Sequence, residues 1–552
     1  MSKFSKFLWM GYDIMLGFEP ELENPGSNRN DNWEELYNTI RWIEELCNHQ
    51  KLGYLSKQCS KKTGQLQVLV NDETGIGVPA QIKFFPLVYE KAENSYHREE
   101  KEINFIREIT DQNGRLHTIL PVGIYDAEIT RGSEYQITNT SFYVYSNKIS
   151  ILTIELNPIL DLKAAGWYCG DLHHHSVYSS PVYGGTDPVI ETPLSVSLSM
   201  KAMGASFGAL SDHHNILNHK EWNDLKNDSF FPIPSKEIST SNGHVMSLGV
   251  KEDVIYHIPD QKERTDTILR REFIRVTDQI KELGGLPQIN HPKDPSSSLS
   301  WNEDFNDILS AFDTMELWNG SVPMIKGSSN YRAFLFWQKL LEEGHYIPVT
   351  AGSDTHNILA NDYHEIYNKL SWMAELIASG RVSLPEELRA QTVLLDSLFT
   401  ISMPILKKWA EHNLTSAGVR TYVHVEGDIT QKKLLEGLRR GHSFLTNGPI
   451  LLPEIEGRGP GEVITGKSEK VDINIKLIAN LPLKKITIYS NGNRTWEYTL
   501  EPEDEQKKKY DYSRTLYDFD VRNVQWLFFT AEDDCSNMAI TNPVFFEDIS
   551  ES

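Results

Sequence analysis

The sequence predicts an α/β domain with parallel strands that lies between two β-sandwich-like domains. Three patterns support this organisation. Residues 64–160 alternate apolar and polar side chains with the two-residue period of a half-buried strand. From 161 to 450, short apolar runs alternate with helical stretches, as in α/β domains. From 451 to 552 the two-residue period returns, so we place domain boundaries after residues 160 and 450.

The first domain, residues 1–160, combines a helix with short strands. Trp33, Leu36 and Ile40 have helical spacing, which predicts an amphipathic helix over residues 32–46 that packs on a neighbouring domain. Alternating runs separated by turn residues predict the strands of a sandwich. These runs are residues 65–70, 78–85, 141–145 and 150–155. Nothing in this domain indicates catalytic chemistry.

The middle domain contains predicted helices at residues 264–283, 328–343 and 430–440. Residues 359–415 interrupt the strand–helix alternation with partly amphipathic helical sequence. We interpret them as an insertion that serves as plain structural cover, as a lid over a site or as a contact in a homo-oligomer.

The last domain, residues 451–552, has alternating runs at residues 471–477, 485–489 and 526–530. The turn residues at 490–494 predict a hairpin. The charged run at 501–509 is typical of a solvated loop.

The composition limits the classes of partner that the protein is expected to bind. With 54 Lys and Arg against 77 Asp and Glu, the formal net charge is -23, which argues against nucleic acid or an anionic membrane as the main partner. No window approaches the roughly 18 apolar residues of a membrane span, and the first residues lack a signal-peptide cleavage site. The four scattered cysteines suggest reduced thiols, so we expect a cytoplasmic protein.

The chain is organised around the stretch Asp171–His175, which contains three consecutive histidines. If residues 167–172 form a strand, His173 and His175 leave its end on the same side, and His174 points elsewhere. Two imidazoles placed in this way can bind one metal ion. Alone, such a pair is a weak signal, because a histidine cluster is often only polar surface.

Later apolar runs also end in ligand-type residues, and parallel strands of an α/β domain bring such ends together. The run at 207–210 leads into Asp212, His213 and His214, and the run at 230–234 leads into Glu237 and His244. The run at 285–289 leads into His291, the run at 312–315 into Glu316, and the run at 346–350 into Asp354 and His356. Together they predict a ring of metal ligands at one mouth of a barrel.

These motifs resemble the PHP (polymerase and histidinol phosphatase) superfamily of metal-dependent hydrolases, and most closely its CehA/McbA, or carbaryl hydrolase-like, branch. The flanking stretches 131–135 and 441–449 also look similar to that branch. The resemblance implies a distorted (β/α)7 barrel over residues 161–450 and two or three divalent ions per chain.

Carried over by motif, the resemblance implies three sets of ligands. The first ion takes His173, His175, Glu237 and Asp354; the second shares Glu237 and adds His244 and His291; the third takes Asp187, His213 and His356. Asp187 is assigned because Asp187 and Pro188 lead into the helix expected from Thr192 onward, although residues 177–186 intervene. Imidazole and carboxylate ligands suit zinc, manganese or iron.

Three further residues are candidates for catalytic roles. Asp212 either orients a metal-bound histidine or caps a helix. His214 and Lys293 either bind substrate or protonate the leaving group, or are plain polar surface. Glu316 and Asn319 are expected to line the pocket. For Glu316 the alternative is a buried partner of another side chain.

The predicted function is a metal-dependent hydrolase that cleaves phosphoester bonds of a small-molecule substrate. Divalent ions lower the pKa of a coordinated water from 15.7 to about 7, which supplies a bridging hydroxide as nucleophile. The alternative substrate is a carboxyl or carbamate ester, and a third possibility is a non-catalytic protein that keeps the PHP shell for binding.

Overall fold

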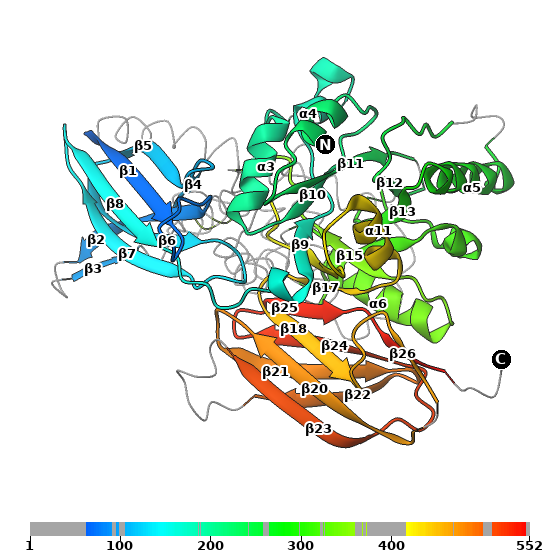
Figure 1. The fold of residues 1–552 in the computed structure, drawn as a ribbon. Coiled ribbons are helices and arrows are strands. Elements are labelled where there is room, and N and C mark those ends of the chain that lie inside the picture. Colours follow the sequence, from blue (N-terminus) through cyan, green and yellow to red (C-terminus); the bar gives the residue numbers. More distant parts are fainter. Residues whose placement is uncertain are drawn as a thin grey trace, which may run out of the picture.

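The structure is a computed structural model that describes residues 62–90, 95–98, 105–185, 187, 189–240, 242–257, 264–296, 299–320, 324, 326–358, 367, 371, 416–466, 468–500 and 511–547. The predicted helix at 32–46, the charged run at 501–509 and nearly all of the predicted insertion at 359–415 lie outside these residues. Figure 1 shows an N-terminal group of strands beside a central α/β part, with a C-terminal group of strands below it.

The N-terminal strands form two sheets with a common core. One sheet has the order β5 (Arg115–Pro121), β1 (Thr63–Asn71), β8 (Ile149–Glu155). The other contains β3 (Ser95–Arg98), β2 (Gln81–Glu90), β6 (Gly123–Thr130) and β7 (Thr138–Val144), with β4 (Ile106–Ile109) also paired to β2. Leu66 and Val68 of β1 are buried against Ile82 and Phe84 of β2 in one apolar cluster. The alternation of burial along β1 follows the period read from the sequence.

Seven strands of the central sheet are neighbours in chain order. They are β9 (Trp167–Asp171), β10 (Phe207–Leu210), β11 (Phe231–Ile238), β12 (His244–Leu248), β13 (Leu286–Asn290), β14 (Thr314–Asn319) and β15 (Val349–Gly352). β16 (Arg420–His424) pairs with the other edge of β9, and β17 (Ser443–Thr446) follows it.

Not all of these strands are parallel. β9, β10 and β11 run parallel, as do β13, β14 and β15. β12 is antiparallel to both of its neighbours, and β16 is antiparallel to β9. The connection between β11 and β12 spans only residues 239–243, which is too short for a parallel crossover. The sequence pattern of apolar runs does not carry strand direction, so this reversal was not predicted.

The two ends of this seven-strand run approach each other just beyond β9 and β15. Asp354 N donates to His173 O at 2.8 Å, and His175 N donates to Thr355 O at 3.1 Å. The Thr421 hydroxyl of β16 links to Ala351 of β15 through both N and O. These contacts bring the segments that follow β9 and β15 to one place.

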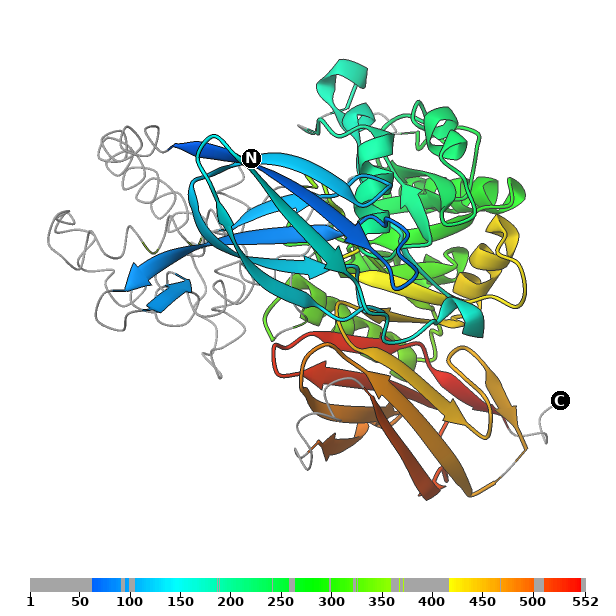
Figure 2. The same ribbon diagram turned by 60° about the vertical axis from the view of Figure 1, so that its left-hand side comes forward.

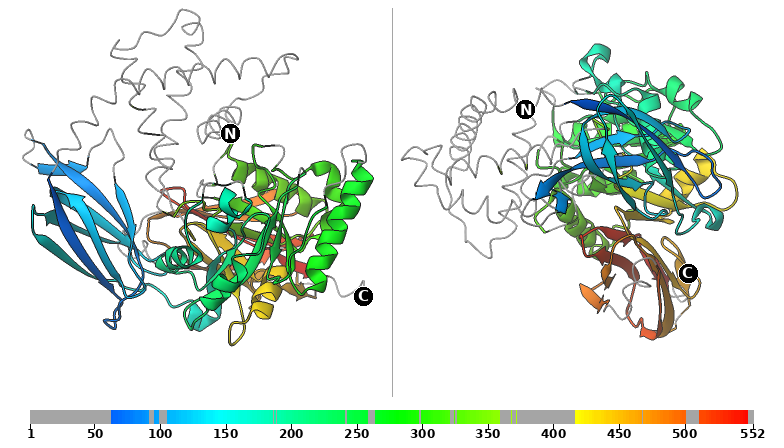
Figure 3. Two further views of the ribbon diagram at one scale, coloured as in Figure 1. Left: turned by 90° about the horizontal axis from the view of Figure 1, so that it is seen from above. Right: turned by 90° about the vertical axis from the view of Figure 1, so that its left-hand side faces the viewer.

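Helices cover the outer side of the central sheet (Figure 3, left). They are α3 (Pro193–Ala202), α4 (His219–Asp224), α5 (Asp266–Glu282), α6 (Ser329–Glu342) and α11 (Gln431–Arg439). A hydroxyl side chain caps the N-terminus of α3, α5, α6 and α11, as in Ser328, which accepts from Tyr331 N at 3.0 Å. The helices predicted at 264–283, 328–343 and 430–440 are confirmed. No helix in the described ranges is long and apolar enough to cross a membrane.

The C-terminal strands continue the central sheet. β25 (Met538–Thr541) pairs with β17, and β24 (Trp526–Asp533), β21 (Leu483–Ser490) and β22 (Arg494–Thr499) follow in order. A second sheet of β18 (Ile450–Ile455), β20 (Lys470–Ile478) and β23 (Tyr512–Asp520) packs on it, and β19 (Val463–Thr465) pairs with β26 (Val544–Glu547). The predicted hairpin at 490–494 joins β21 to β22. Figure 2 shows this layered pair below the α/β part.

Candidate metal centre

All nine residues predicted as metal ligands lie in one cluster at one end of the central strands. Their donor atoms form three overlapping groups that could each hold a metal ion. The groups are His173, His175, Glu237 and Asp354; His175, Asp187, His213 and His356; and His213, Glu237 and His244. His291 completes the cluster through its contact with Glu237.

The first group is the set of four predicted for the first ion. The two Nε2 atoms of His173 and His175 are 3.2 Å apart, and Glu237 Oε2 lies 3.2 and 3.4 Å from them. Asp354 Oδ1 lies 3.3 Å from His173 Nε2 and 3.0 Å from His175 Nε2. Four ligand atoms placed tetrahedrally at 2.0–2.1 Å from zinc are about 3.3 Å apart. The donor set therefore has the spacing that one ion requires.

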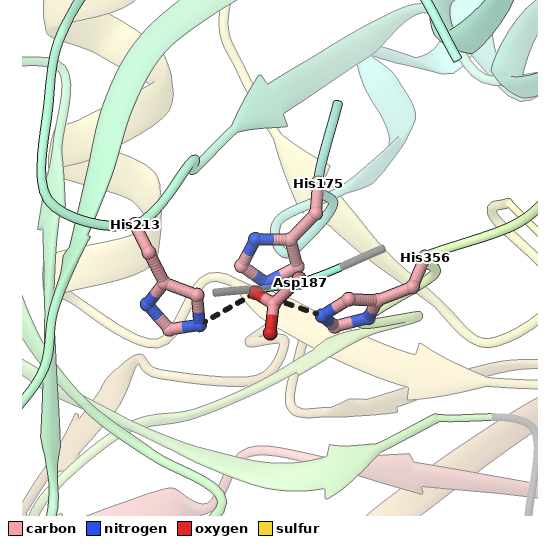
Figure 4. A group of neighbouring side chains, drawn as sticks. All are labelled: His175, Asp187, His213 and His356. Atoms are coloured by element: carbon pink, nitrogen blue, oxygen red, sulfur yellow. Dashed lines mark ion pairs between the residues drawn. The ribbon is translucent and has the colours of Figure 1, made fainter. Parts of the chain in front are cut away.

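The second group surrounds Asp187 (Figure 4). Asp187 Oδ2 lies 3.4 Å from His213 Nε2 and 3.5 Å from His356 Nε2. The ring of His175 stacks at centroid distances of 4.2 Å on His356 and 4.7 Å on His213. Asp187, His213 and His356 are the predicted third set, and the structure adds His175 to it. Residues 177–185 include two turns of 3₁₀ helix, η2 (Val177–Ser179) and η3 (Pro181–Tyr183), and Asp187 lies in the cluster.

Glu237 occupies the middle of the cluster. Its Oε2 faces His173, His175 and, at 3.3 Å, His213. Its Oε1 faces His244 Nδ1 at 3.0 Å and His291 Nε2 at 2.9 Å. The prediction placed Glu237 after a strand, but it lies inside β11, and His244 begins β12 on the facing strand. Its two oxygens thus face two different sets of histidines, as a bridging carboxylate does.

The second ring nitrogen of several ligand histidines is held by the protein. Glu316 Oε1 lies 3.0 Å from His173 Nδ1, Ser179 Oγ 3.1 Å from His175 Nδ1, and Ser239 Oγ 3.0 Å from His213 Nδ1. The backbone O of Asp354 lies 2.9 Å from His356 Nδ1. An Nδ1–H that donates to such a partner leaves Nε2 as the acceptor for a metal and fixes the orientation of the ring.

Asp212 acts on this set through serines and does not contact a histidine side chain directly. Its carboxylate accepts from Ser176 N and Oγ at 2.6 Å each and from Ser179 Oγ at 2.7 Å. Because Ser179 Oγ also meets His175 Nδ1, Asp212 orients the serine that orients the ligand. Of the two roles predicted for Asp212, the contacts are those of an indirect orienting group.

Two other buried carboxylates were harder to assign from the sequence. Glu316 contacts His173 through Oε1 and accepts from His291 N at 3.0 Å through Oε2, so it fixes two ligands. Asp171 accepts from His173 N, Ser353 N and Ala417 N, at 3.2, 2.9 and 2.7 Å. Asp171 therefore ties the end of β9 to the segments after β15 and before β16. Its position two residues before His173 was the available signal for this role.

His214 and Lys293, the other two candidates for catalysis, lie at the edge of the cluster. His214 is exposed, with its ring centroid 5.5 Å from that of His213. The Lys293 ammonium pairs with Glu303 and lies 4.0 Å from the ring centroid of Phe336. Asn319, at the end of β14, donates to Glu316 at 3.0 Å and to Asp354 at 3.2 Å. His174 points away from the cluster, with Nε2 2.7 Å from Ser416 Oγ.

The backbone has unusual conformations where the predicted ligands meet. His291 and Asp354 have φ values of 26° and 47°, in a region that residues other than glycine seldom occupy. A Cβ on Gly352 would lie 2.4 Å from the Cβ of His173, so only glycine fits there. These features let β9 and β15 approach closely enough for their ligands to share one site.

Charge is concentrated in this buried site. Burial opposes protonation of His173, but the carboxylates of Asp354 and Glu316 outweigh it and raise its pKa well above the usual value. The pKa values of His175 and His291 rise to about 9 for the same reason, against their burial. Burial disfavours the charged form of Glu237 and Asp354, yet the surrounding imidazoles hold both pKa values well below the usual range. Both carboxylates are therefore ionised and ready to act as ligands.

Comparison with known proteins assigns no family. No family model and no curated protein matches the chain. Among solved structures, an amidohydrolase from Chromobacterium violaceum shares 16% identity over 34% of this chain and 87% of that chain, with a TM-score of 0.25. The TIE protein of Bacillus anthracis shares 15% identity over 20% of this chain and 18% of that chain, with a TM-score of 0.13. The minor pilin GBS52 of Streptococcus agalactiae shares 25% identity over 18% and 47%, with a TM-score of 0.14.

The chain thus spans less than half the length of the latter two proteins, and all three TM-scores are too low to support an argument about fold or function. What the structure itself establishes is a buried cluster of histidines and carboxylates that could bind metal ions.

Proposed function

We propose that this protein is a PHP-type metal-dependent hydrolase that cleaves phosphoester bonds of a small-molecule substrate. The observation that carries the proposal is the position of Glu237, with histidines at 2.9–3.4 Å on both of its oxygens. The chain-order arrangement of β9 to β15 supports a distorted seven-stranded β/α barrel as the scaffold.

The side chains of the cluster would have different roles in binding the metal ions. Glu237 and Asp354 provide ionised oxygens, and the tethered rings of His173, His175 and His213 provide Nε2 atoms. Bound divalent ions would lower the pKa of a coordinated water and stabilise charge that develops on the attacking and leaving oxygens.

Charge favours an anionic substrate. Three divalent ions would bring six positive charges, whereas the predicted ligands Asp187, Glu237 and Asp354 bring three negative ones and Glu316, beside His173, adds a fourth. The site would keep a positive balance in a protein whose formal net charge is -23. A phosphoester therefore fits the site better than a neutral ester does.

The test is hydrolysis of a matched aryl panel by metal-reconstituted protein: a phosphomonoester, a phosphodiester, a carboxyl ester and a carbamate. We expect turnover of the phosphate members, abolished by a chelator and restored by the metal. Turnover confined to the carboxyl ester or the carbamate would replace the proposed substrate class. Stoichiometric metal binding without turnover of any member would indicate a protein that uses the site for binding alone.

A further inference from the structure

A second charged site lies where the N-terminal strands meet the central sheet. A cavity of about 450 Å³ is lined there by residues before the start of β10 and β11, by Trp167 at the start of β9 and by Arg420 and Tyr422 of β16. The metal cluster lies beyond the opposite ends of β9, β10 and β11. The five residues of β9 alone separate the two ends by about 13 Å at 3.3 Å per residue. Arg420 begins β16 beside Thr421, whose partner Gly170 lies toward the metal end of β9. No residue that lines the cavity is a predicted metal ligand, so the cavity is distinct from the candidate metal centre.

Cations outnumber carboxylates in this cavity. Its lining includes Arg131, Lys163, Lys201 and Arg420, against Glu134 and Asp161. This excess is notable in a protein with 77 acidic and 54 basic residues. Small-molecule sites are concave and carry a few converging polar groups, and the volume of this cavity lies in their usual range of roughly 300–1,000 Å³.

The Arg420 guanidinium is buried and forms no ion pair within the described ranges, although the charge of Glu134 lies close enough to interact with it. The side chain is 2% exposed, and its Nη1 donates to the backbone O of Met203 at 2.9 Å. Its Nε has no hydrogen-bond partner, and no carboxylate in the described ranges lies within ion-pair distance of Arg420, Arg131 or Lys201. Burying an arginine usually requires a carboxylate or phosphate partner.

The nearby carboxylate is engaged elsewhere. Glu134 Oε2 accepts from Leu162 N at 3.1 Å, and Oε1 accepts from the Tyr422 hydroxyl at 3.2 Å. Arg131 Nη1 donates to the backbone O of Lys201 at 3.0 Å, which brings these two cationic residues together. Burial and the charge of Arg131 lower the pKa of Lys201. An anion in the cavity would relieve this crowding of positive charge.

We infer that this cavity binds the phosphate or carboxylate group of a small organic anion. Arg131, Lys201 and Arg420 supply the positive charge, and Tyr135 and Trp167 supply aromatic surface for the body of the ligand. This site accounts for the stretch 131–135, which the metal centre does not use. The inference is independent of the proposed hydrolase activity.

The test is calorimetric titration of the chelator-treated 552-residue chain with phenylphosphonate, benzoate and neutral benzyl alcohol. We expect one saturable site for an anionic probe and none for the alcohol, and the tighter anion identifies the preferred head group. Lys201→Met should weaken binding by about tenfold or more, because it removes a charge-assisted contact. Lys163→Met removes another positive charge that lines the cavity, at an exposed position where the substitution should not disturb folding, and should weaken binding in the same direction if Lys201→Met does not fold.

Two controls separate this site from others. Lys470→Met removes a remote surface charge, and His356→Ala disrupts the histidine cluster, so neither should change the affinity. Absence of saturable binding would overturn the inference. Binding that survives Lys201→Met and Lys163→Met but is lost in His356→Ala would also overturn it, because the anion would then occupy the metal cluster.

Discussion

The candidate metal centre and the apolar core of the C-terminal domain are both buried, but burial has opposite consequences in them. β20 and β21 bury Ile473, Ile475 and Ile488 in an apolar cluster, which stabilises the fold by about 25 cal/mol per Å² of apolar surface removed from water. The metal centre buries histidines and carboxylates such as His173 and Glu237, at 0% and 1% exposure. Burying ionisable groups costs free energy. We therefore explain the burial of ionisable groups in the metal centre by the metal ions that they could bind.

Among the substitutions that test this difference between the two regions, Glu237→Gln should have the largest effect. The amide keeps the shape but loses the charge that faces histidines on both sides, so bound metal should be lost. We expect kcat/KM to fall by roughly 10³-fold, or about 4 kcal/mol of transition-state stabilisation. Metal analysis and turnover measure this, with Glu252→Gln on the exposed surface as the matched control. Full metal content and activity in folded Glu237→Gln protein would disprove the role of Glu237.

Ile475→Ala should have the converse effect. The side chain is 2% exposed in the C-terminal core, so its truncation should lower the free energy of unfolding by about 2–5 kcal/mol. Metal content per folded chain should not change. Denaturant unfolding and metal analysis of the same samples provide both quantities. Loss of metal at a temperature where the variant remains folded would show that the two regions are coupled.

Glu316→Gln tests whether a buried carboxylate that only orients the ligands also affects metal binding. It meets His173 Nδ1 at 3.0 Å and accepts from His291 N. Removing such a partner typically lowers metal affinity or activity by about 10–100-fold. Competition with a metal-binding dye measures the affinity. An unchanged affinity would assign Glu316 to structure alone.

Metal affinity should also depend on pH. The metal-free pKa of His175 and His291 is about 9, so both rings are protonated at neutral pH and must lose a proton to bind a metal. Affinity should therefore rise from pH 7 to 9, by about tenfold per pH unit for each proton released. Dye competition at each pH tests this, and a flat profile over that window would contradict it.

The stability of the metal-free protein should change in the opposite sense. A histidine whose pKa rises from 6.5 to about 9 on folding stabilises the fold below pH 6.5, and this contribution is lost as the pH rises through 9. Glu237 and Asp354 remain ionised over this window and do not alter its sign.

The sequence predicted the elements better than their arrangement. Helix α5 and strand β20 follow from local periodicity, which a short window contains. The reversal of β12 does not, because strand direction depends on the connection and not on the alternation of side chains. The continuation of the central sheet from β17 into β25 was also not predictable, since pairing across about 90 residues leaves no local pattern.

The candidate site was predictable only through its motifs. Strand geometry alone places His173 and His175 on one side, and the ends of the apolar runs place Glu237 and Asp354 near them. The assignment of these four residues to one ion required the resemblance to a known family. The orienting roles of Ser179 and Glu316 depend on contacts between segments far apart in the chain, and a single sequence does not record such contacts.

The most direct test of the central claim is anomalous X-ray diffraction from crystals of this protein grown with zinc or manganese. The account predicts anomalous peaks on both sides of the Glu237 carboxylate, one beside His173, His175 and Asp354 and one beside His244 and His291. A crystal at full metal loading with no peak within bonding distance of Glu237 would contradict the claim that this cluster is a metal centre.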